Sequence, residues 1–392
     1  MSRAPGILIM IAYEIDIGFA IGRLVEVFHE MALRWAGDPR RVHFSFSRIN
    51  GKGSSNLPQG FDNLLEVDYR RSDPADLRRL SEYIRQHQIE IIFALDMGVQ
   101  CACLKAARLA GVRTVISYWG APMSSIVSSA KLMLKRLEVR LLRWSRPDYF
   151  VFESEAMRRF GVLGRGLAGT KTVVIPTGID AEKFRRMPEV PGMVYDRFGI
   201  PRDRTIVVYM GHLHRRKGVH VLMGAAEHWV QSMCRQDVHC LFLGNRENEV
   251  AEFRAEFNVA APFITFGGYQ SDIPELLSGC AIGCVPSSGW DSFPMSSLEM
   301  QSCGLPVVVS DLQGVPETVV DQVTGVVVPA GDPVALAGTI ISLVDDPARR
   351  ERMSLAARRR IVDKFTRDRQ IDSLAHFMSD VLGPSSGTFS AD

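Results

Sequence analysis

The chain lacks several features that would assign it to a simple class. Its 392 residues contain no run of about 18 apolar residues, the length that a helix needs to cross a bilayer. The formal net charge is only +2, which excludes the strongly basic surface of a dedicated nucleic-acid-binding protein and also excludes a polyanion. The apolar residues 6–12 are followed by Glu14 and Asp16 without a small-residue cleavage site, so we expect a first strand there and no signal peptide.

Cysteine is scarce and follows no metal-binding or disulfide pattern. The seven cysteines are odd in number and spread from Cys101 to Cys303, which fits buried thiols in a reducing compartment better than a disulfide framework. Cys101 and Cys103 lie close in sequence, but no second pair stands near them. We therefore expect no metal site there.

Apolar runs that read as buried strands alternate with segments of helical periodicity through most of the chain. The strands are predicted at residues 7–12, 42–46, 89–94, 113–117, 149–152, 172–175, 205–210, 239–243, 263–266, 281–285, 306–310 and 325–328. This alternation predicts an α/β fold with parallel, doubly wound sheets. At this length we expect two domains, residues 1–190 and 191–365, followed by a final helix at 366–383 and a loose tail at 384–392.

The most informative stretch follows the strand predicted at residues 281–285. Asp291 stands on the loop at the carboxyl end of that strand, and Ser296 is a candidate N-cap of a short helix that Gly304 closes. Ligands bind at this edge of an α/β sheet, and the amides of a helix start favour a phosphate. Ser296-x-x-Glu299 is equally a capping box, in which Glu299 bonds only to its own helix. The spacing alone does not decide between the two.

A basic loop follows the strand predicted at residues 205–210. Four polar or cationic side chains precede a helix with an apolar face: His212, Arg215, Arg216 and Lys217. Cations beside a helix N-terminus suit a diphosphate, because the helix dipole, the backbone amides and the point charges act together. The alternative is a solvated basic loop, which composition alone favours.

Three other segments give weaker signals. Gly18, after the first strand, permits close approach to a ligand, although a tight turn explains one glycine equally well. Tyr118 and Trp119 end another strand and offer flat surfaces to a sugar ring, whereas such aromatic pairs more often pack in a core. The pattern Gly164-Arg-Gly166-Leu-Ala-Gly169 matches a dinucleotide motif but precedes a strand, so we interpret it as a flexible loop.

Residues 131–146 combine leucines at helical spacing with six basic residues and Trp144. Such a helix can lie on an anionic membrane surface with the indole at the interface. It can equally pack its leucines on the sheet and leave its cations in water. Both interpretations remain open from the sequence.

Two stretches together resemble family 4 of the retaining glycosyltransferases. The two-carboxylate signature of that family is similar to Asp291-Ser-Phe293-Pro294-Met295-Ser-Ser-Leu-Glu299, which is followed by the strand at 306–310. A second segment that is typical of the family is similar to Val-Val-Ile-Pro-Thr-Gly-Ile-Asp at residues 173–180. Lys217 matches the lysine of the family's basic loop. The chain departs from the family pattern at Asp291, where Glu is usual, at His212, where Arg is usual, and at Phe19, where a second glycine is common.

The resemblance implies the GT-B fold, two Rossmann-like doubly wound parallel-sheet domains facing across a cleft. It implies an acceptor-binding N-terminal domain and a C-terminal domain that binds a nucleoside diphosphate sugar. Glu299 would hold the ribose, Asp291 would lie near the donor sugar, and Lys217 with Arg216 would stabilise the leaving diphosphate. The remaining donor contacts would be Gly18, His212, Arg215, Gly268, Tyr269, Phe293, Pro294, Met295 and Ser296, and Tyr118 and Trp119 would contact the acceptor.

The function that this resemblance implies is transfer of a sugar from a UDP- or GDP-sugar, with retention, to a hydroxyl of a glycan, a lipid-linked saccharide or a small molecule. The chain has no Asp-x-Asp sequence, which other glycosyltransferases use to hold a metal diphosphate, so we expect no metal and no further cofactor. The alternatives are a sugar-nucleotide epimerase and a non-catalytic nucleotide-sugar-binding protein. We expect a cytoplasmic protein of polysaccharide or glycoconjugate biosynthesis, peripheral on the inner membrane face if residues 131–146 contact lipid.

Overall fold

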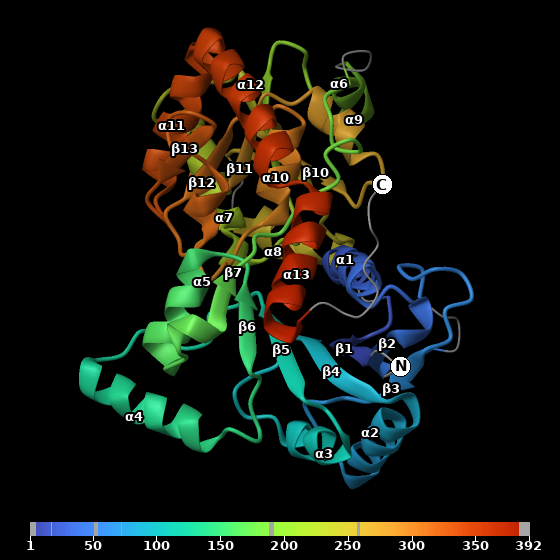
Figure 1. Cartoon of the computed structure of the whole chain (residues 1–392). Helices are drawn as coiled ribbons and strands as arrows, with labels where there is room; N and C mark the ends of the chain where they lie inside the picture. Colours follow the sequence, from blue (N-terminus) through green and yellow to red (C-terminus); the bar gives the residue numbers. More distant parts are fainter. Residues whose placement is uncertain are drawn as a thin grey trace. The chain divides into compact units, whose positions relative to one another are not determined.

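The computed structural model describes residues 5–16, 18–50, 54–71, 73–187, 192–256 and 259–383. The chain divides into two compact units, Met1–Pro176 with Asp368–Asp392, and Thr177–Arg367 (Figure 1). The sequence predicted the first change of domain at residue 190 and the second at residue 365, whereas the units change at residues 176 and 367.

The first unit is built on a seven-stranded parallel sheet. Its strands are β1 (Gly6–Glu14), β2 (Val42–Arg48), β3 (Leu64–Glu66), β4 (Ile89–Leu95), β5 (Thr114–Trp119), β6 (Tyr149–Phe152) and β7 (Thr172–Val174). They lie in the order β3-β2-β1-β4-β5-β6-β7. Continuous apolar runs form these strands because helices cover both faces of the sheet. The sequence did not predict β3, which is too short to show a period.

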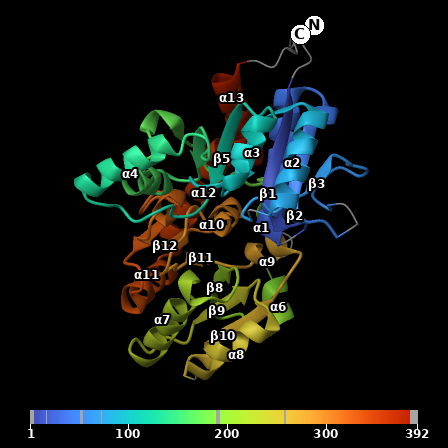
Figure 2. The same ribbon diagram turned by 90° about the horizontal axis from the view of Figure 1, so that it is seen from below.

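Helices on each face bury the sheet of the first unit. They are α1 (Phe19–Ala36), α2 (Pro74–His87), α3 (Ala102–Ala110), α4 (Ser129–Leu141), α5 (Glu155–Arg159) and α13 (Arg367–Leu382). Helices α1 and α13 lie on one face of the sheet, and α2 and α3 on the other (Figures 1 and 2). Phe28 of α1 and Leu374 of α13 are fully buried in the first layer, and Leu80 of α2 and Leu104 of α3 in the second. The last helix of the chain thus belongs to the core of the first unit.

The second unit repeats the plan with six parallel strands. They are β8 (Thr205–Met210), β9 (Val238–Leu243), β10 (Ile264–Gly268), β11 (Ile282–Val285), β12 (Val307–Ser310) and β13 (Gly325–Val328), in the order β10-β9-β8-β11-β12-β13. The order reverses between β8 and β11, and in doubly wound sheets ligands bind outside the carboxyl ends of the strands at such a point. The loops after β8 and β11 are therefore the first place to look for a site.

Helices also cover both faces of the second sheet. They are α6 (Met193–Phe198), α7 (Val219–Gln231), α8 (Glu247–Glu256), α9 (Ile273–Ser278), α10 (Met295–Ser302), α11 (Pro333–Asp345) and α12 (Pro347–Lys364). Trp229 of α7 and Leu336 of α11 are buried on one face, and Leu276 of α9 and Leu298 of α10 on the other. Among the helices that the structure describes, none combines the length and the apolar character needed to cross a bilayer.

Helix α1 begins at Phe19, directly after Gly18, and takes in Gly22. One local prediction in the first unit is wrong. The segment from Gly164 to Gly169 is not a flexible loop. It starts in the last residues of a π-helical turn (Phe160–Arg165), and a Cβ on Gly164 would lie 2.6 Å from the carbonyl oxygen of Ser124. The glycine there serves close packing of backbone on backbone.

Candidate functional site

The loops after β8 and β11 are locked together through their backbones. The carbonyl oxygen of Arg216 accepts hydrogen bonds from the amides of Ser288 and Gly289, each at 2.9 Å. Gly218 has a φ of 75°, and a Cβ at this position would lie 1.7 Å from the carbonyl oxygen of Pro286. Only glycine fits such an approach. The two loops therefore form one rigid surface at the switch point of the sheet.

An ion pair between Lys217 and Asp291 lies at the centre of this surface. Lys217 Nζ is 2.8 Å from Asp291 Oδ2, and the hydroxyl of Ser287 donates to the same oxygen at 2.7 Å. The amide of Ser292 donates to Oδ1 at 3.2 Å. Asp291 is only 5% exposed, whereas Lys217 is half-buried. The pair therefore holds an ammonium group at the carboxyl edge of the sheet, within reach of solvent.

The other predicted cations of this loop are held by their own chain. The Arg216 guanidinium lies 4.1 Å over the ring of Trp290 and donates to the carbonyl oxygen of that residue at 2.6 Å. Arg215 pairs with two glutamates of α8 and so faces away from Asp291. The exposed ring of His212 lies with Nδ1 3.4 Å from Glu249. Of the four side chains predicted in this loop, Lys217 is the one that the structure brings to Asp291.

Helix α10 starts at the same edge, but not as predicted. Its N-cap residue is Pro294, and Ser296 lies inside the first turn, so the prediction that Ser296 caps the helix is wrong. Met295 and Ser296 are half-buried at the helix start, whereas Glu299 is 7% exposed in the second turn. The hydroxyl of Ser297 bonds to that of Thr318 at 2.8 Å, which fixes the orientation of the helix.

Phe293 contributes to the core of the second unit. Its side chain is 3% exposed, and its ring centroid lies 5.5 Å from that of Phe365. Pro294 is buried beside it. The side chains of Phe293 and Pro294, two predicted donor contacts, therefore anchor the loop after β11 in the core of the second unit.

The loops after β9 and β10 form a second part of the same edge. The amide of Gly244 donates to the carbonyl oxygen of Gly268 at 2.7 Å, and the amide of Gly268 donates to Asn245 Oδ1 at 2.9 Å. Gly268 has a φ of 68°, and the next side chain, Tyr269, is 74% exposed. Sequence reasoning missed the buried Asn245, although a Gly-Asn pair directly after the strand predicted at 239–243 was the available signal.

The predicted acceptor residues of the first unit are less accessible than expected. Tyr118 is fully buried, packs 5.1 Å from the ring of Phe28 and accepts a hydrogen bond from Gln370 at 3.2 Å. The prediction that its side chain contacts an acceptor is therefore wrong, because its position on β5 turns the ring into the core. Trp119 is half-buried and donates from Nε1 to a neighbouring carbonyl. Gly18 precedes α1 with a φ of 69°, and a Cβ at this position would meet no atom within 4 Å.

Asp96 is a half-buried carboxyl group that sequence reasoning missed. It follows β4 directly, has a φ of 56°, and accepts a hydrogen bond from the amide of Gly120 at 3.0 Å. Burial raises its pKa above the ordinary value for a carboxyl group. The pKa of Tyr13 is raised as well, first by burial and then by the charge of Asp96. Left-handed residues other than glycine and buried carboxyl groups both concentrate at functional sites.

Within the described parts of the chain, no three His, Cys, Asp or Glu side chains gather in a way that could hold a metal ion.

Comparisons with known proteins agree with this architecture. Residues 196–360 match the family model described as Glycosyl transferases group 1, and residues 26–183 match the model described as Glycosyltransferase Family 4. In fold, the chain is similar to a glycosyltransferase of Rickettsia africae, with a TM-score of 0.77 and 16% identity over 96% of this chain and 99% of that chain. It is also similar to Anabaena HepE, solved in complex with UDP, with a TM-score of 0.76 and 18% identity over 96% and 100% of the two chains.

Two curated relatives show similarity in sequence. A phosphatidyl-myo-inositol mannosyltransferase of Mycobacterium leprae is 30% identical over 47% of this chain and 47% of its own length, so the match spans about half of that relative. A UDP-Gal:alpha-D-GlcNAc-diphosphoundecaprenol alpha-1,3-galactosyltransferase of Escherichia coli is 25% identical over 79% of this chain and 80% of its own length.

Proposed function

The chain belongs to the family 4 glycosyltransferases with the GT-B fold, and from this premise we propose that it is a retaining, metal-independent glycosyltransferase. The donor is a nucleoside diphosphate sugar, and the acceptor is a hydroxyl group of a glycan, a lipid-linked saccharide or a small molecule. UDP in the HepE structure and UDP-galactose in the name of the Escherichia coli relative support a nucleotide-sugar donor. Another relative is named as GDP-mannose-dependent, so the proposal includes both UDP-sugars and GDP-sugars as donors.

The observation that carries this proposal is the pair of Lys217 and Asp291 on interlocked loops at the switch point. When the bond between the anomeric carbon and the diphosphate oxygen breaks, negative charge develops on the leaving oxygen. An ammonium group already fixed at that edge stabilises this charge without having to reorganise. Positive charge develops on the sugar ring, which Asp291 stabilises from close by.

Retention follows when the acceptor attacks the face that the diphosphate leaves. The acceptor oxygen forms the new bond to the anomeric carbon, and its proton passes to the departing phosphate oxygen. No covalent enzyme intermediate is needed on this route. Glu299, in the second turn of α10, would accept hydrogen bonds from the ribose hydroxyls, and the main chain near Gly268 would contact the base.

A thermal-shift screen of nucleotides and sugar nucleotides tests the donor site. A ligand that binds the folded state raises apparent stability by mass action, by about 2.7 kcal/mol at a concentration of 100 times its Kd. We expect a shift with UDP or GDP and their sugars, and a much smaller shift in Glu299→Ala. A nucleotide that protects the variant as well as the wild type would contradict the assignment of Glu299.

We also propose that α4 rests on an anionic membrane surface. In the alternative, the leucines of α4 pack on the sheet and are buried. The large apolar side chains on the outer face of α4 are instead exposed to solvent. Five of these are each at least 54% exposed: Met133, Leu134, Leu137, Leu141 and Trp144. Met133, Leu134, Leu137 and Leu141 lie along one stripe of α4, and Trp144 follows in the turn after the helix. Exposed apolar stripes of this size mark interaction surfaces.

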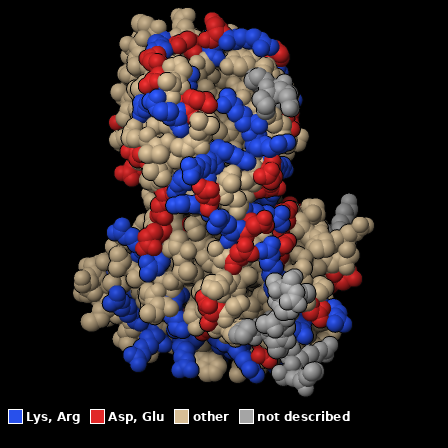
Figure 3. All heavy atoms as spheres, turned by 45° about the horizontal axis from the view of Figure 1, so that its top comes forward, with Lys and Arg blue, Asp and Glu red and all other residues tan. Residues whose placement is uncertain are grey.

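Charge on the same segment favours lipid over a neutral partner. Six basic residues lie between residues 131 and 146, and the single acidic residue, Glu138, is bound by Arg165 at 3.0 Å. Lys and Arg side chains gather along the lower left edge of the first unit in Figure 3, over the region of α4. Basic residues beside a membrane contribute roughly 1 kcal/mol each near an anionic surface.

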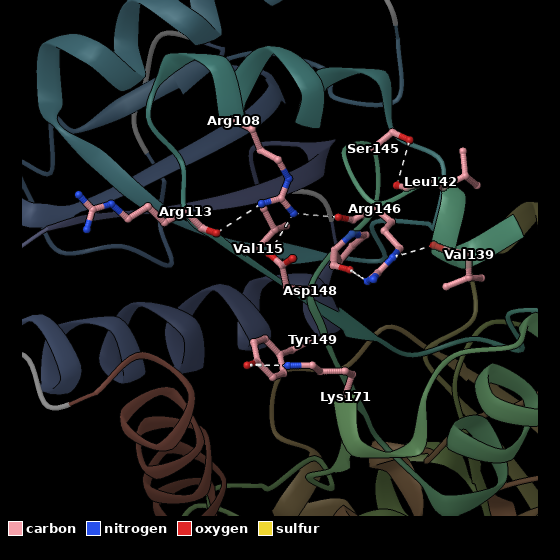
Figure 4. Close-up of polar contacts among 11 residues, drawn as sticks. Arg108, Arg113, Val115, Val139, Leu142, Ser145, Arg146, Asp148, Tyr149 and Lys171 are labelled. Carbon is pink, nitrogen blue, oxygen red and sulfur yellow. Dashed lines mark hydrogen bonds and ion pairs between the residues drawn. The ribbon is translucent and has the colours of Figure 1, made fainter. Parts of the chain in front are cut away.

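The inner side of α4 is fixed to the unit, which leaves the apolar stripe facing outward. Figure 4 shows Arg146 donating from Nε to the carbonyl oxygen of Val139, at 2.9 Å, near the end of the helix. Arg108 in turn donates to the carbonyl oxygen of Arg146 at 3.1 Å and pairs with Asp148 at 2.9 Å. The segment after α4 is thereby held against β5 and β6.

Vesicle co-sedimentation tests this surface. We expect the protein to sediment with vesicles that contain anionic lipid and not with neutral phosphatidylcholine vesicles, and we expect salt to weaken the association. Leu137→Ser combined with Leu141→Ser should abolish most of it. Leu355→Ser on α12, at a position with 65% exposure, is the matched control. Equal sedimentation of the α4 variant and the control would refute the proposal.

A further inference from the structure

A cavity of about 590 Å³ opens at the carboxyl ends of β1, β2 and β3 in the first unit. This volume lies within the range of roughly 300–1,000 Å³ that is typical of small-molecule sites. The sequence predictions placed no residue in it. Its position at the carboxyl edge of a doubly wound sheet is where such folds bind ligands.

The wall of the cavity is polar and nearly balanced in charge. Three arginines and four carboxylates line it, so the wall carries no excess of positive charge. Asp68 is only 9% exposed and is held by two of the arginines, with Arg70 Nε at 3.2 Å and Arg71 Nε at 3.4 Å. Glu66 accepts a hydrogen bond from the amide of Ile49 at 2.7 Å. Guanidinium donors therefore lie beside carboxylate acceptors in the wall of the cavity.

One ion pair of the wall is open enough to bind a ligand. Arg48 and Glu14 lie 4.0 Å apart, which is the longest ion pair of the lining, and their side chains are 68% and 50% exposed. Tyr13 adds a half-buried ring, with the guanidinium of Arg70 5.6 Å from its centroid. The cavity thus has an aromatic surface beside a loosely paired donor and acceptor.

We propose that this cavity binds an uncharged saccharide and that, on the proposed function, this saccharide is the part of the acceptor that the first unit recognises. A sugar hydroxyl both donates and accepts, so it is matched by guanidinium groups beside carboxylates. A phosphate or a carboxylate would gain little in this cavity, because carboxylates of the wall already neutralise the charges of its arginines. The apolar face of a sugar ring packs on an aromatic ring such as that of Tyr13.

Saturation-transfer NMR on the whole chain, without donor, tests this inference. The probes are glucose, galactose, mannose, N-acetylglucosamine and inositol, each compared with its monophosphate at concentrations up to the millimolar range. We expect at least one neutral probe to bind and its phosphate to bind no more tightly. Arg48→Gln and Glu14→Gln should each weaken binding by about tenfold, the loss of one charged hydrogen bond. Arg40→Gln, an exposed arginine outside the cavity, is the control.

Each outcome bears on the inference separately from the proposed function. Failure of all neutral probes, tighter binding of the phosphates, or equal binding by the cavity variants and Arg40→Gln would overturn the cavity assignment. Sugar transfer from a donor would still stand in that case. Conversely, saccharide binding at the cavity without release of nucleotide from any UDP- or GDP-sugar would leave the cavity intact and refute the transferase.

Discussion

Lys217→Met separates the structural role of the central ion pair from its role in transfer. The substitution keeps an unbranched side chain that is one atom shorter, and it removes the charge that compensates Asp291, which is 5% exposed. Removing one partner of a fully buried pair costs about 3–5 kcal/mol. Here Ser287 and the amide of Ser292 still donate to the carboxylate, and the lysine side chain is 29% exposed. We therefore expect a loss of roughly 2 kcal/mol.

The assay is thermal unfolding of single and double variants. A change of 1 kcal/mol shifts the Tm of a domain of 150–250 residues by roughly 2–4 °C, so Lys217→Met should lower the Tm by about 4–8 °C. Adding Asp291→Asn removes the uncompensated charge and should restore at least half of this loss. Transfer should not recover, because losing a preorganised group that stabilises developing charge costs about 10²–10³ in kcat.

Three results would contradict the reasoning. If the Tm of Lys217→Met equals that of Lys364→Met, an exposed control on α12, the pair contributes nothing to stability. If the double variant loses the sum of the two single losses, Lys217 and Asp291 are not coupled. Recovery of transfer in the double variant would show that neither charge takes part in the reaction.

Four further outcomes are expected. Gly218→Ala should lower the Tm more than Gly331→Ala, because both positions have positive φ but only the Cβ at 218 meets a carbonyl oxygen, that of Pro286. Burial raises the pKa of Asp96, so the folded state favours the neutral carboxyl group and loses stability as the pH rises. Asp96→Asn should therefore raise the Tm at neutral pH, and it should raise the Tm by a smaller amount at acid pH. Burial lowers the pKa of His43 to about 4, so the urea midpoint should fall as pH decreases from about 6.5 to 4, and His43→Gln should reduce that dependence. Transfer should persist in EDTA, and full loss that manganese restores would contradict metal independence.

The sequence predicted the frame of both sheets well where apolar runs are continuous and end at glycine, proline or a charge. The strand expected at 205–210 is β8 to the residue, and that at 149–152 is β6. Parallel topology then placed the loops after β8 and β11 at the same edge of the sheet. The contact of Lys217 with Asp291 depends on β8 and β11 being neighbours, and the sequence pattern did not predict that order.

Tertiary partners account for the errors. The sequence assigned Arg215 to the diphosphate, but the glutamates that bind it lie on α8, and no local pattern connects the two. Tyr118 and Trp119 alternate on a strand covered on both faces, and periodicity does not indicate which of them is accessible in such a strand. The close approach at Gly218 depends on a distance to Pro286 that the sequence does not contain.

The position of helix α13 in the sequence means that the first unit cannot complete its core until almost the whole chain has been synthesised. Its residues Ile371, Leu374 and Met378 belong to the core of the first unit, yet they emerge only after the whole of Thr177–Arg367. At typical rates of synthesis that interval lasts roughly ten to forty seconds. During it, the nascent N-terminal sheet waits with part of one apolar face uncovered, so premature termination before residue 368 leaves a chain that is prone to capture by chaperones or proteases.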